Sequence, residues 1–473
     1  MSTVKSEAVQ GEVAERPRRA DLLVRNAELL ETMDGPGIPG GWVSVTDGFV
    51  SAVGKPGSEP PAHDVIDARN CLVTPGLVNT HHHIFQNLTR AFAPVANVEF
   101  SDWLSELGKL WRRMDEEAVY ASTWIGLAEL ALGGCTTTTD QLYTHPVPKL
   151  VDAEISAARE LGFRFQPSRG STDLQRGEMG AMPDPLIEDT DAILADCQRL
   201  VATHHDPAPG AMVRIALGPG SPYHCTPELM RESAELAEHH DVRLHTHLAQ
   251  VPDEEEYSLS LYGRRPVELL EDFGWGGPRT WVAHCIFPSA EDIVKLGRWQ
   301  TGVAHCPSSN MMICQGIAPV VELREAGVPV GLGCDGSAST DHASLWLEAR
   351  TALLLGRLRK GPTGMAARDV LEIATVGGAR CLGRSDIGIL SPGKCGDIVV
   401  WPLEGVQFAG AWTDPVEAWL RCGPVQPRHT IVAGRPLVRN GELESPRLEE
   451  MLALHATISR AWQQEYLLSG SSG

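Results

Sequence analysis

The sequence predicts an α/β protein in which a (β/α)8 TIM-like barrel is joined to a small β-sandwich domain formed from both chain ends. Through the middle of the chain, short apolar runs alternate with helical stretches of roughly 10 to 20 residues, as in a parallel sheet with crossover helices. Both ends instead have the short strands and Gly or Asp-Gly turns of an all-β unit. A chain of 473 residues can hold one barrel and one smaller domain.

The β-rich ends are expected to form the sandwich domain, to which residues 21–73 and 386–445 contribute one half each. Turn residues separate short β-branched runs in both segments, which is typical of hairpins. We expect a flexible polar tail over residues 1–20, and a C-terminal helix with a flexible tail over residues 446–473. The strand candidates of the domain are residues 22–25, 42–45, 50–53, 397–401 and 430–434.

The barrel is expected over residues 74–385. Eight candidate strands occur there, each leading into a helical stretch, as a (β/α)8 barrel requires. A doubly wound sheet is the alternative, but no Gly-rich phosphate-binding loop follows the first strand. The eight candidates are residues 76–78, 136–139, 163–166, 214–217, 242–245, 281–283, 302–304 and 328–332.

Charge and composition indicate which kinds of molecule the protein binds. The 40 Lys and Arg against 61 Asp and Glu give a formal charge of −21, which argues against nucleic acids and anionic membranes as partners. No apolar run approaches the roughly 20 residues that span a bilayer, and the N-terminal segment lacks the apolar stretch of a secretory signal. Eleven scattered cysteines without a C-x-x-C pair indicate reduced thiols rather than disulfides or a thiolate zinc site. We therefore expect a cytoplasmic enzyme with a small-molecule substrate.

A histidine triplet, His81-His82-His83, directly follows the first barrel strand candidate. Because alternate side chains of a strand share a face, His81 and His83 are expected to point together into the barrel mouth, and His82 is expected to point away. Such a triplet can also be a surface accident or a tag, but tags lie at chain ends. Two imidazoles on one face suit a shared metal ion.

Further polar side chains stand at the ends of later strand candidates. His247 follows the fifth candidate at the same alternate spacing from His245, His284 follows the sixth, and Asp335 follows the eighth. Taken alone, such a histidine is more often a core or surface residue, and Asp-Gly is more often a turn. Together they occupy carboxyl ends of strands, where barrel active sites are built. Imidazole nitrogens, one carboxylate oxygen and an open position for water are the ligand set of a catalytic zinc or similar divalent ion, so the expected reaction is hydrolysis.

The motifs around these residues resemble those of the amidohydrolase superfamily, and specifically of its mononuclear-metal aminohydrolases, which include 8-oxoguanine deaminases and hydroxyatrazine ethylaminohydrolases. The resemblance extends from about residue 22 to about residue 442. It implies a hydrolase of the cyclic amidine class, acting on C–N bonds other than peptide bonds, that associates into homo-oligomers. The motifs lie at residues 75–83, 247–249, 283–284, 305–311, 335–339 and 391–397.

Carried over residue by residue, the resemblance implies one divalent metal ion bound by His81, His83, His247 and Asp335. Zinc is the expected ion, with iron, cobalt and manganese as alternatives. Asp335 is expected to act as a base toward the nucleophilic water. His284 is expected to hydrogen-bond that water or the substrate, and so to take part in both catalysis and binding.

Two glutamines are expected to bind the substrate. Gln86 matches a glutamine that the subgroup has in its pocket wall. Gln250 departs from the family, which has a glutamate there, three residues after the metal-binding histidine, and uses it to shuttle protons. Because an amide cannot accept and release a proton near neutral pH, Gln250 is expected to keep substrate recognition but to lose ring protonation. Replacement of the missing glutamate by one of the acids at residues 253–256 is an alternative, but such a run is expected to form a solvated helix face.

These features favour a metal-dependent hydrolase that removes an amino or alkylamino group from a purine-, pterin- or triazine-like ring. Gln141, Phe287 and Met312 also depart from the subgroup and, with Gln250, favour a substrate other than 8-oxoguanine. One alternative is a metal hydrolase of another C–N, amide, carbamate-like or C–halogen bond that needs no proton from a glutamate. The other is a catalytically impaired binder, for which Gln250 is the positive sign.

Overall fold

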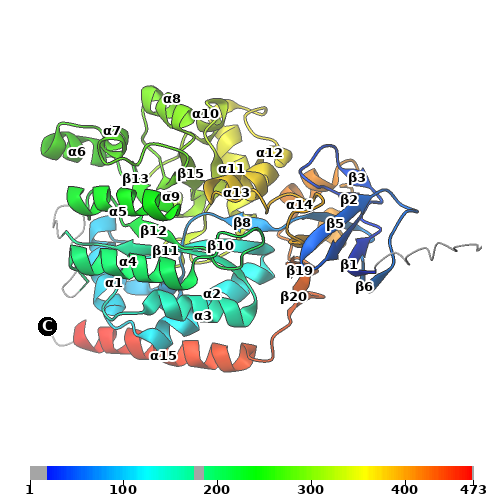
Figure 1. Ribbon diagram of the computed structural model, residues 1–473, viewed down its shortest axis with the longest axis horizontal. Coiled ribbons are helices and arrows are strands. Elements are labelled where there is room, and N and C mark those ends of the chain that lie inside the picture. The colour runs from blue at the N-terminus through cyan, green and yellow to red at the C-terminus, as the bar shows by residue number, and fades with distance from the viewer. Residues whose placement is uncertain (1–18, 175–185, 471–473) are drawn as a thin grey trace, which may run out of the picture.

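The computed structural model describes residues 19–174 and 186–470, which form a large helical part beside a smaller β-rich part (Figure 1). The large part contains a closed barrel of eight parallel strands, and the small part contains two sheets. The last barrel strand pairs with the first, with Leu332 opposite Asn79. The predicted (β/α)8 barrel with a β-sandwich from both chain ends is therefore confirmed, and the doubly wound sheet is excluded. Only the last two residues of the tail expected over residues 1–20 lie within the described residues.

Every candidate barrel strand overlaps an observed one, but β10 (Cys135–Leu142) and β11 (Arg164–Ser171) extend further than the apolar pattern indicated. Buried polar residues in these extensions are accommodated by hydrogen bonds. Arg169 donates to Glu188 and Asp196, and Gln141 donates to the carbonyl of Gly218. Around the barrel the strands are β10 (Cys135–Leu142), β11 (Arg164–Ser171), β12 (Ala216–Pro219), β13 (Arg243–Leu248), β14 (Thr280–His284), β15 (Gly302–His305), β16 (Val330–Leu332) and β8 (Leu77–Asn79).

Amphipathic helices cover the outside of the barrel (Figure 1). In α8 (Ala290–Trp299), for example, Ser289 accepts the N–H of Asp292 and caps the helix, while Ile293 and Leu296 face the core. The other helices are α1 (Phe100–Trp111), α2 (Glu116–Leu132), α3 (Leu150–Leu161), α4 (Thr190–His204), α5 (Pro227–His240), α6 (Glu254–Tyr262), α7 (Pro266–Asp272), α9 (Pro307–Met312), α10 (Val320–Glu325), α11 (Leu345–Lys360), α12 (Ala367–Glu372), α13 (Gly378–Cys381) and α14 (Pro415–Cys422).

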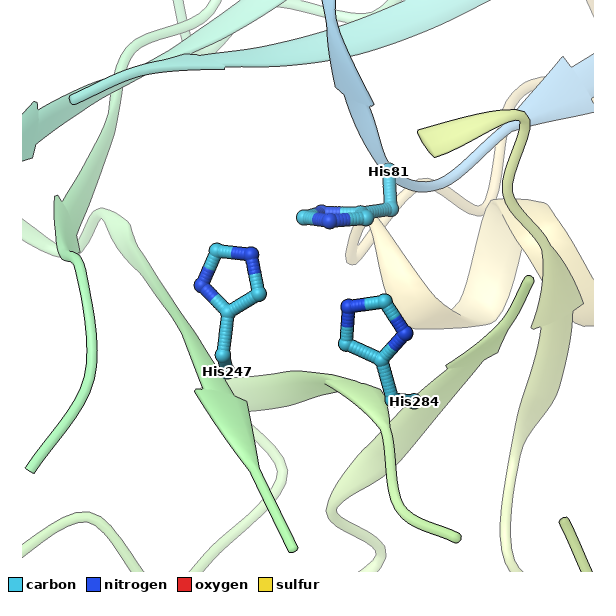
Figure 2. A group of neighbouring side chains, drawn as sticks. All are labelled: His81, His247 and His284. Atoms are coloured by element: carbon cyan, nitrogen blue, oxygen red, sulfur yellow. The ribbon is translucent and has the colours of Figure 1, made fainter. Parts of the chain in front are cut away.

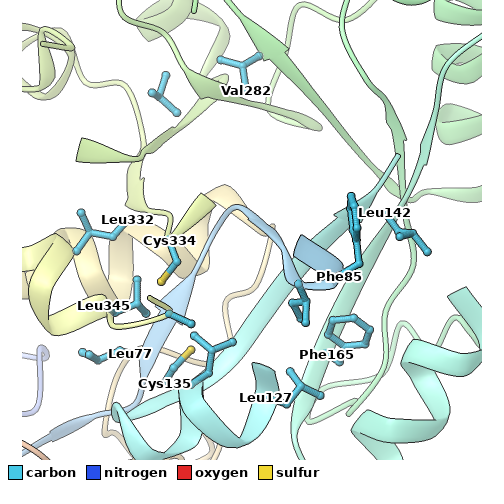
Figure 3. Close-up of a cluster of buried hydrophobic side chains, with 14 of the residues drawn as sticks. Leu77, Phe85, Leu127, Cys135, Leu142, Phe165, Val282, Leu332, Cys334 and Leu345 are labelled. Atoms are coloured by element: carbon cyan, nitrogen blue, oxygen red, sulfur yellow. The ribbon is translucent and has the colours of Figure 1, made fainter. Parts of the chain in front are cut away.

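Buried apolar side chains fill the space around the barrel strands (Figure 3). Leu77, Leu332 and Phe165 come from strands, whereas Leu127 comes from α2 and Phe85 from the short helix η1 (Ile84–Thr89). Burial of a side chain of this size contributes roughly 1.5–3 kcal/mol. This packing holds the strand ends, and the polar residues on them, in fixed positions.

The smaller part consists of a four-stranded sheet from the N-terminal segment and a seven-stranded sheet from both chain ends. In the larger sheet, β18 (Ile398–Pro402) from the C-terminal segment pairs antiparallel with β7 (Cys71–Pro75) from the N-terminal segment. The four-stranded sheet contains β5 (Phe49–Gly54), β4 (Trp42–Thr46), β1 (Ala20–Arg25) and β6 (Ala62–Asp67). The seven-stranded sheet contains β21 (Glu442–Leu443), β20 (Arg435–Arg439), β19 (His429–Val432), β18 (Ile398–Pro402), β7 (Cys71–Pro75), β2 (Leu29–Leu30) and β3 (Ile38–Pro39).

The two parts are joined by buried contacts. Arg164 on β11 forms two 2.9 Å hydrogen bonds with Asp397, which directly precedes β18. The terminal helix α15 (Leu448–Gly470) leaves the sandwich and runs along the barrel beside α2 (Figure 1). Its His455 contacts Asn87 of η1 at 2.9 Å. None of the helices in the described ranges has the length and apolar character needed to cross a membrane.

Candidate functional site

The carboxyl ends of four barrel strands bring the predicted site residues together. Beyond β8, the short strand β9 (His82–His83) pairs with β17 (Asp335–Gly336), which places Asp335 beside the histidine triplet. His247 lies on β13, and His284 is the last residue of β14. His81, His83, His284 and Asp335 are all buried. The residues that were expected to share a site, because of their spacing at strand ends, thus lie together in the structure.

The backbone at this end of the barrel is unusual. His284 and Asp335 have φ values of 69° and 58°, and Ala249, just after β13, has a φ of 49°. Left-handed conformations cost a residue with a side chain roughly 1–2 kcal/mol, so surrounding packing must hold them. They turn the chain sharply where it leaves the barrel, and this fixes the direction of the site side chains.

The site atoms lie within a few ångströms of one another. His83 Nε2 is 3.2 Å from His247 Nε2, and Asp335 Oδ1 is 3.3 Å from His81 Nε2 and 3.5 Å from His83 Nε2. In Figure 2 the rings of His81, His247 and His284 point toward one space. Four bonds of about 2.05 Å arranged tetrahedrally around zinc place their ligand atoms about 3.3 Å apart. The observed separations therefore fit a metal ion of that size.

The hydrogen bonds of His81 determine which of its nitrogens carries a proton. His245 Nδ1 lies 3.0 Å from the carbonyl oxygen of Trp281, which can only accept, so that nitrogen must donate. His245 Nε2 is then an acceptor, and it receives the proton of His81 Nδ1 at 2.8 Å. The lone pair of His81 Nε2 is left facing Asp335. Within the described part of the chain, this buried atom has no hydrogen-bond partner.

The same reasoning applies to the other two histidines. His83 Nδ1 donates to the carbonyl of Gln141 at 2.7 Å, and His247 Nδ1 donates to the carbonyl of Gly220 at 2.6 Å. Burial lowers the pKa of His83 to about 3 and that of His247 well below its usual value, so both rings are neutral at pH 7. Three Nε2 atoms and one carboxylate therefore face one another with lone pairs, and no proton lies between them. Such a buried donor set fits a divalent cation.

The candidate acid–base residues are held by their neighbours. Ser309 donates to Asp335 Oδ2 at 2.5 Å, and the N–H of Gly336 donates to Oδ1 at 2.8 Å, which favours the ionised carboxylate. His284 Nδ1 donates to Asn310 Oδ1 at 2.9 Å, so its Nε2 is free to accept. That nitrogen lies 3.8 Å from Asp335 Oδ2. Burial lowers the pKa of His284 to about 4, which keeps the ring neutral at pH 7.

A pocket opens over this cluster, and both predicted substrate-binding glutamines line it. Gln86 donates to the hydroxyl of Tyr143 at 3.1 Å, and the amide group of Gln250 donates to Gln315 Oε1 at 3.2 Å. Gly336 allows Gln86 to approach, because a Cβ there would lie 1.7 Å from Gln86 Oε1. Both amides are thus fixed in the pocket wall, where they can bond to polar ring atoms.

The rest of the pocket wall is mainly apolar and aromatic. Among the described residues, those that line it include neither lysine nor arginine. A neutral ring suits this wall better than an anion, because a buried anion needs a cationic partner. The apolar and aromatic lining residues are Phe100, Trp103, Leu104, Tyr143, Tyr223, Val251 and Ile313.

The acidic run after Gln250 was expected to face solvent, and for Glu254 that expectation is wrong. Asp253, Glu255 and Glu256 are exposed, but the side chain of Glu254 is only 4% exposed and lines the pocket. Its Oε2 accepts the backbone N–H of Gln250 at 2.8 Å, and this contact draws the first residue of α6 inward. A run of four acidic residues carries no signal that distinguishes the one facing the pocket.

Sequence reasoning assigned no role to several other residues at the site. His245, Ser309 and Asn310 orient the candidate ligands and His284, and Tyr143 supports Gln86. Ser309 and Asn310 lie in a family-like segment, which was the one available signal. Their partners are 26 residues away along the chain, so only the fold reveals the contacts.

Comparison with known proteins identifies the family. Residues 72–436 match the model of the Amidohydrolase family, which is more than half of the chain and includes the whole cluster of histidines and Asp335. The chain belongs to the amidohydrolase family. The predicted resemblance is thereby confirmed, as is the prediction of a hydrolase acting on C–N bonds other than peptide bonds.

Two named enzymes are similar to this amidohydrolase over most of its length. An 8-oxoguanine deaminase of Pseudomonas aeruginosa is 44% identical over 442 residues, which is 93% of this chain and 98% of that protein. A hydroxydechloroatrazine ethylaminohydrolase of a Pseudomonas species is 37% identical over 441 residues, which is 91% of this chain and 88% of that protein. Both remove a nitrogen group from a heterocycle, according to their names.

A solved structure supports the fold of this amidohydrolase. The atrazine chlorohydrolase of Arthrobacter aurescens, in complex with zinc, superimposes with a TM-score of 0.88 at 32% identity. The match covers 93% of this chain and 100% of the chlorohydrolase. The likeness extends over barrel and sandwich together, so the arrangement of the two parts is also that of the chlorohydrolase.

Proposed function

We propose that this amidohydrolase hydrolytically removes an amino or alkylamino group from a purine-, pterin- or triazine-like heterocycle, with one divalent metal ion. Zinc is the proposed ion, with iron, cobalt or manganese as alternatives. The names of its relatives support the substrate class, since they include an 8-oxoguanine deaminase and a hydroxydechloroatrazine ethylaminohydrolase. We also propose that the enzyme works in the cytoplasm as a homo-oligomer, without nucleic acid or membrane partners.

The observation that carries this proposal is the meeting of three unprotonated Nε2 atoms with one carboxylate. His81, His83, His247 and Asp335 are the proposed ligands, because their donor atoms converge. His81 Nε2 has no hydrogen-bond partner among the described residues, and Asp335 also accepts hydrogen bonds from Ser309 and Gly336. A divalent ion bound there would lower the pKa of a water molecule and supply hydroxide at neutral pH.

The chain's own residues then handle the protons. Asp335 Oδ2 is the proposed base, which takes one proton from the attacking water and passes it to the leaving amine. His284 accepts a hydrogen bond from that water through Nε2, because its Nδ1 proton is engaged by Asn310. Gln86 and Gln250 hold the ring by hydrogen bonds, and the apolar wall excludes bulk water.

One observation favours a second candidate function. Gln250 stands where family deaminases have a proton-shuttling glutamate, and its amide is bonded to Gln315 rather than to an acid. A hydrolase of an amide, a carbamate-like, a C–halogen or another C–N bond would need no such proton, and a solved structural relative is a chlorohydrolase. The same feature, Gln250, also fits a catalytically impaired protein that binds the heterocycle without turning it over.

One experiment separates these functions. Metal content is measured on the purified protein, and release of ammonia or alkylamine is screened over oxidised purines, pterins and hydroxylated triazines. Chloride release from chlorinated triazines and binding by calorimetry are measured in parallel. Amine release that is lost on metal removal supports the first function. Chloride release without amine release supports the second function. Binding of a heterocycle without any turnover supports the catalytically impaired binder.

A further inference from the structure

We propose that Glu254 is the general acid that protonates the ring nitrogen of the substrate, in place of the glutamate missing at position 250. This inference rests on the proposed deaminase function. Gln250 and Glu254 line the same pocket. Glu254 opens α6, four residues after Gln250, and its Oε2 lies 2.8 Å from the Gln250 backbone nitrogen. This hydrogen bond holds the Glu254 carboxyl group beside the residue whose side-chain amide is proposed to bind the substrate.

The surroundings of Glu254 favour the protonated carboxylic acid. The side chain is buried, and the bond that it accepts comes from a backbone N–H rather than from a cation. Burial raises the pKa of Glu254 to about 8, although backbone hydrogen bonds from Gln250 and Ala249 oppose the shift. Among the described residues, Tyr223 and Cys285 interact electrostatically with Glu254, and burial raises the pKa of both, so they are neutral. The carboxyl therefore holds a proton at pH 7 and can release it near that pH.

The proton balance of the reaction closes with this assignment. As the water oxygen bonds to the ring carbon, Asp335 takes one water proton and Glu254 gives its proton to the adjacent ring nitrogen. Asp335 then delivers its proton to the amine, and the C–N bond breaks with its electron pair going to the amine nitrogen. The remaining hydroxyl proton returns to Glu254 as the ring carbonyl forms. Water is consumed, one amine leaves, and both carboxyl groups regain their starting states.

Glu254→Gln separates this role from a structural one. The glutamine keeps an oxygen that can accept the Gln250 N–H, but it carries no transferable proton. We expect kcat for 8-oxoguanine, a pterin or hydroxydechloroatrazine to fall about 10²- to 10⁴-fold, while metal content is unchanged. The wild-type rate should fall as pH rises through about 8, and the rate of the variant should not show this decrease. Glu256→Gln, an exposed change on the same helix, is the matched control and should behave as wild type.

Rescue provides a readout that a structural role would not move, and stability reports whether Glu254 holds a proton. Gln250→Glu added to Glu254→Gln should restore at least a tenth of the wild-type rate, because it returns a proton donor to the same wall. With a folded-state pKa above its usual 4.5, Glu254 stabilises the fold fully below that pH, and this contribution is lost as pH rises toward about 8. The stability of wild type relative to Glu254→Gln should therefore fall between about pH 5 and pH 8.

The contrary outcomes are distinct. An unchanged rate and pH profile in Glu254→Gln, a rate that Gln250→Glu fails to restore, or a stability difference independent of pH would each overturn the role of Glu254. Failure of wild-type protein to release amine from every probe would instead overturn the proposed deaminase function. In that case the stability measurement still reports whether Glu254 holds a proton.

Discussion

Nδ1 of His81 lies 2.8 Å from Nε2 of His245, so a histidine outside the proposed ligand set fixes the tautomer of one inside it. His245 in turn stacks on Trp281, with ring centroids 4.4 Å apart, and donates to the Trp281 backbone. The orientation of a proposed metal ligand thus depends on the floor of the barrel rather than on the pocket.

His245→Phe tests this dependence. Phenylalanine keeps a flat ring against Trp281 but removes the acceptor for His81 Nδ1, so the proposed ligand loses its fixed tautomer. We expect metal affinity to fall about 10- to 100-fold with the fold retained, as measured by competition with a chromophoric chelator. His239→Phe, an exposed change on α5, should leave affinity unchanged. Equal affinity of His245→Phe and wild type would refute the account of His81.

Gln250→Glu tests the effect of having glutamine where family deaminases have glutamate. The substitution adds the proton-shuttling carboxyl of family deaminases to the proton donor proposed at Glu254, so the rate of amine release from ring amines should rise while far-UV circular dichroism stays unchanged. Gln315→Glu places a carboxyl on the partner of the Gln250 amide and serves as the comparison. A lower amine release rate in Gln250→Glu than in wild type would show that position 250 only binds the substrate.

The buried ion pair between barrel and sandwich should be critical for stability. Arg164→Met leaves the carboxylate of Asp397 buried without its cation, and loss of one partner of such a pair costs about 3–5 kcal/mol. Urea unfolding followed by tryptophan fluorescence measures the loss. Arg69→Met breaks the exposed pair with Asp67 and should cost less than about 1 kcal/mol. Similar small losses in both variants would contradict the importance of the buried pair.

Much of the fold could be predicted from sequence because it depends on local periodicity, whereas the proposed ligand set was implied by the family resemblance of the strand-end motifs. Alternate residues at strand ends placed His81 and His83 together, and the same end of the barrel gathered His247 and Asp335. The role of His245 could not be predicted, since it depends on a contact with a residue 164 positions away. The burial of Glu254 could not be predicted either, because the neighbouring acids in its helix are exposed and the backbone N–H of Gln250 draws only this one inward.

The most direct test of the central claim is the metal content of wild type, His83→Ala and Asp335→Ala, measured by mass spectrometry alongside amine release from the same samples. The account predicts one divalent ion per chain in wild type, loss of bound metal and of turnover in both variants, and retained folding by circular dichroism. Turnover by metal-free Asp335→Ala protein would contradict the proposed site and its chemistry.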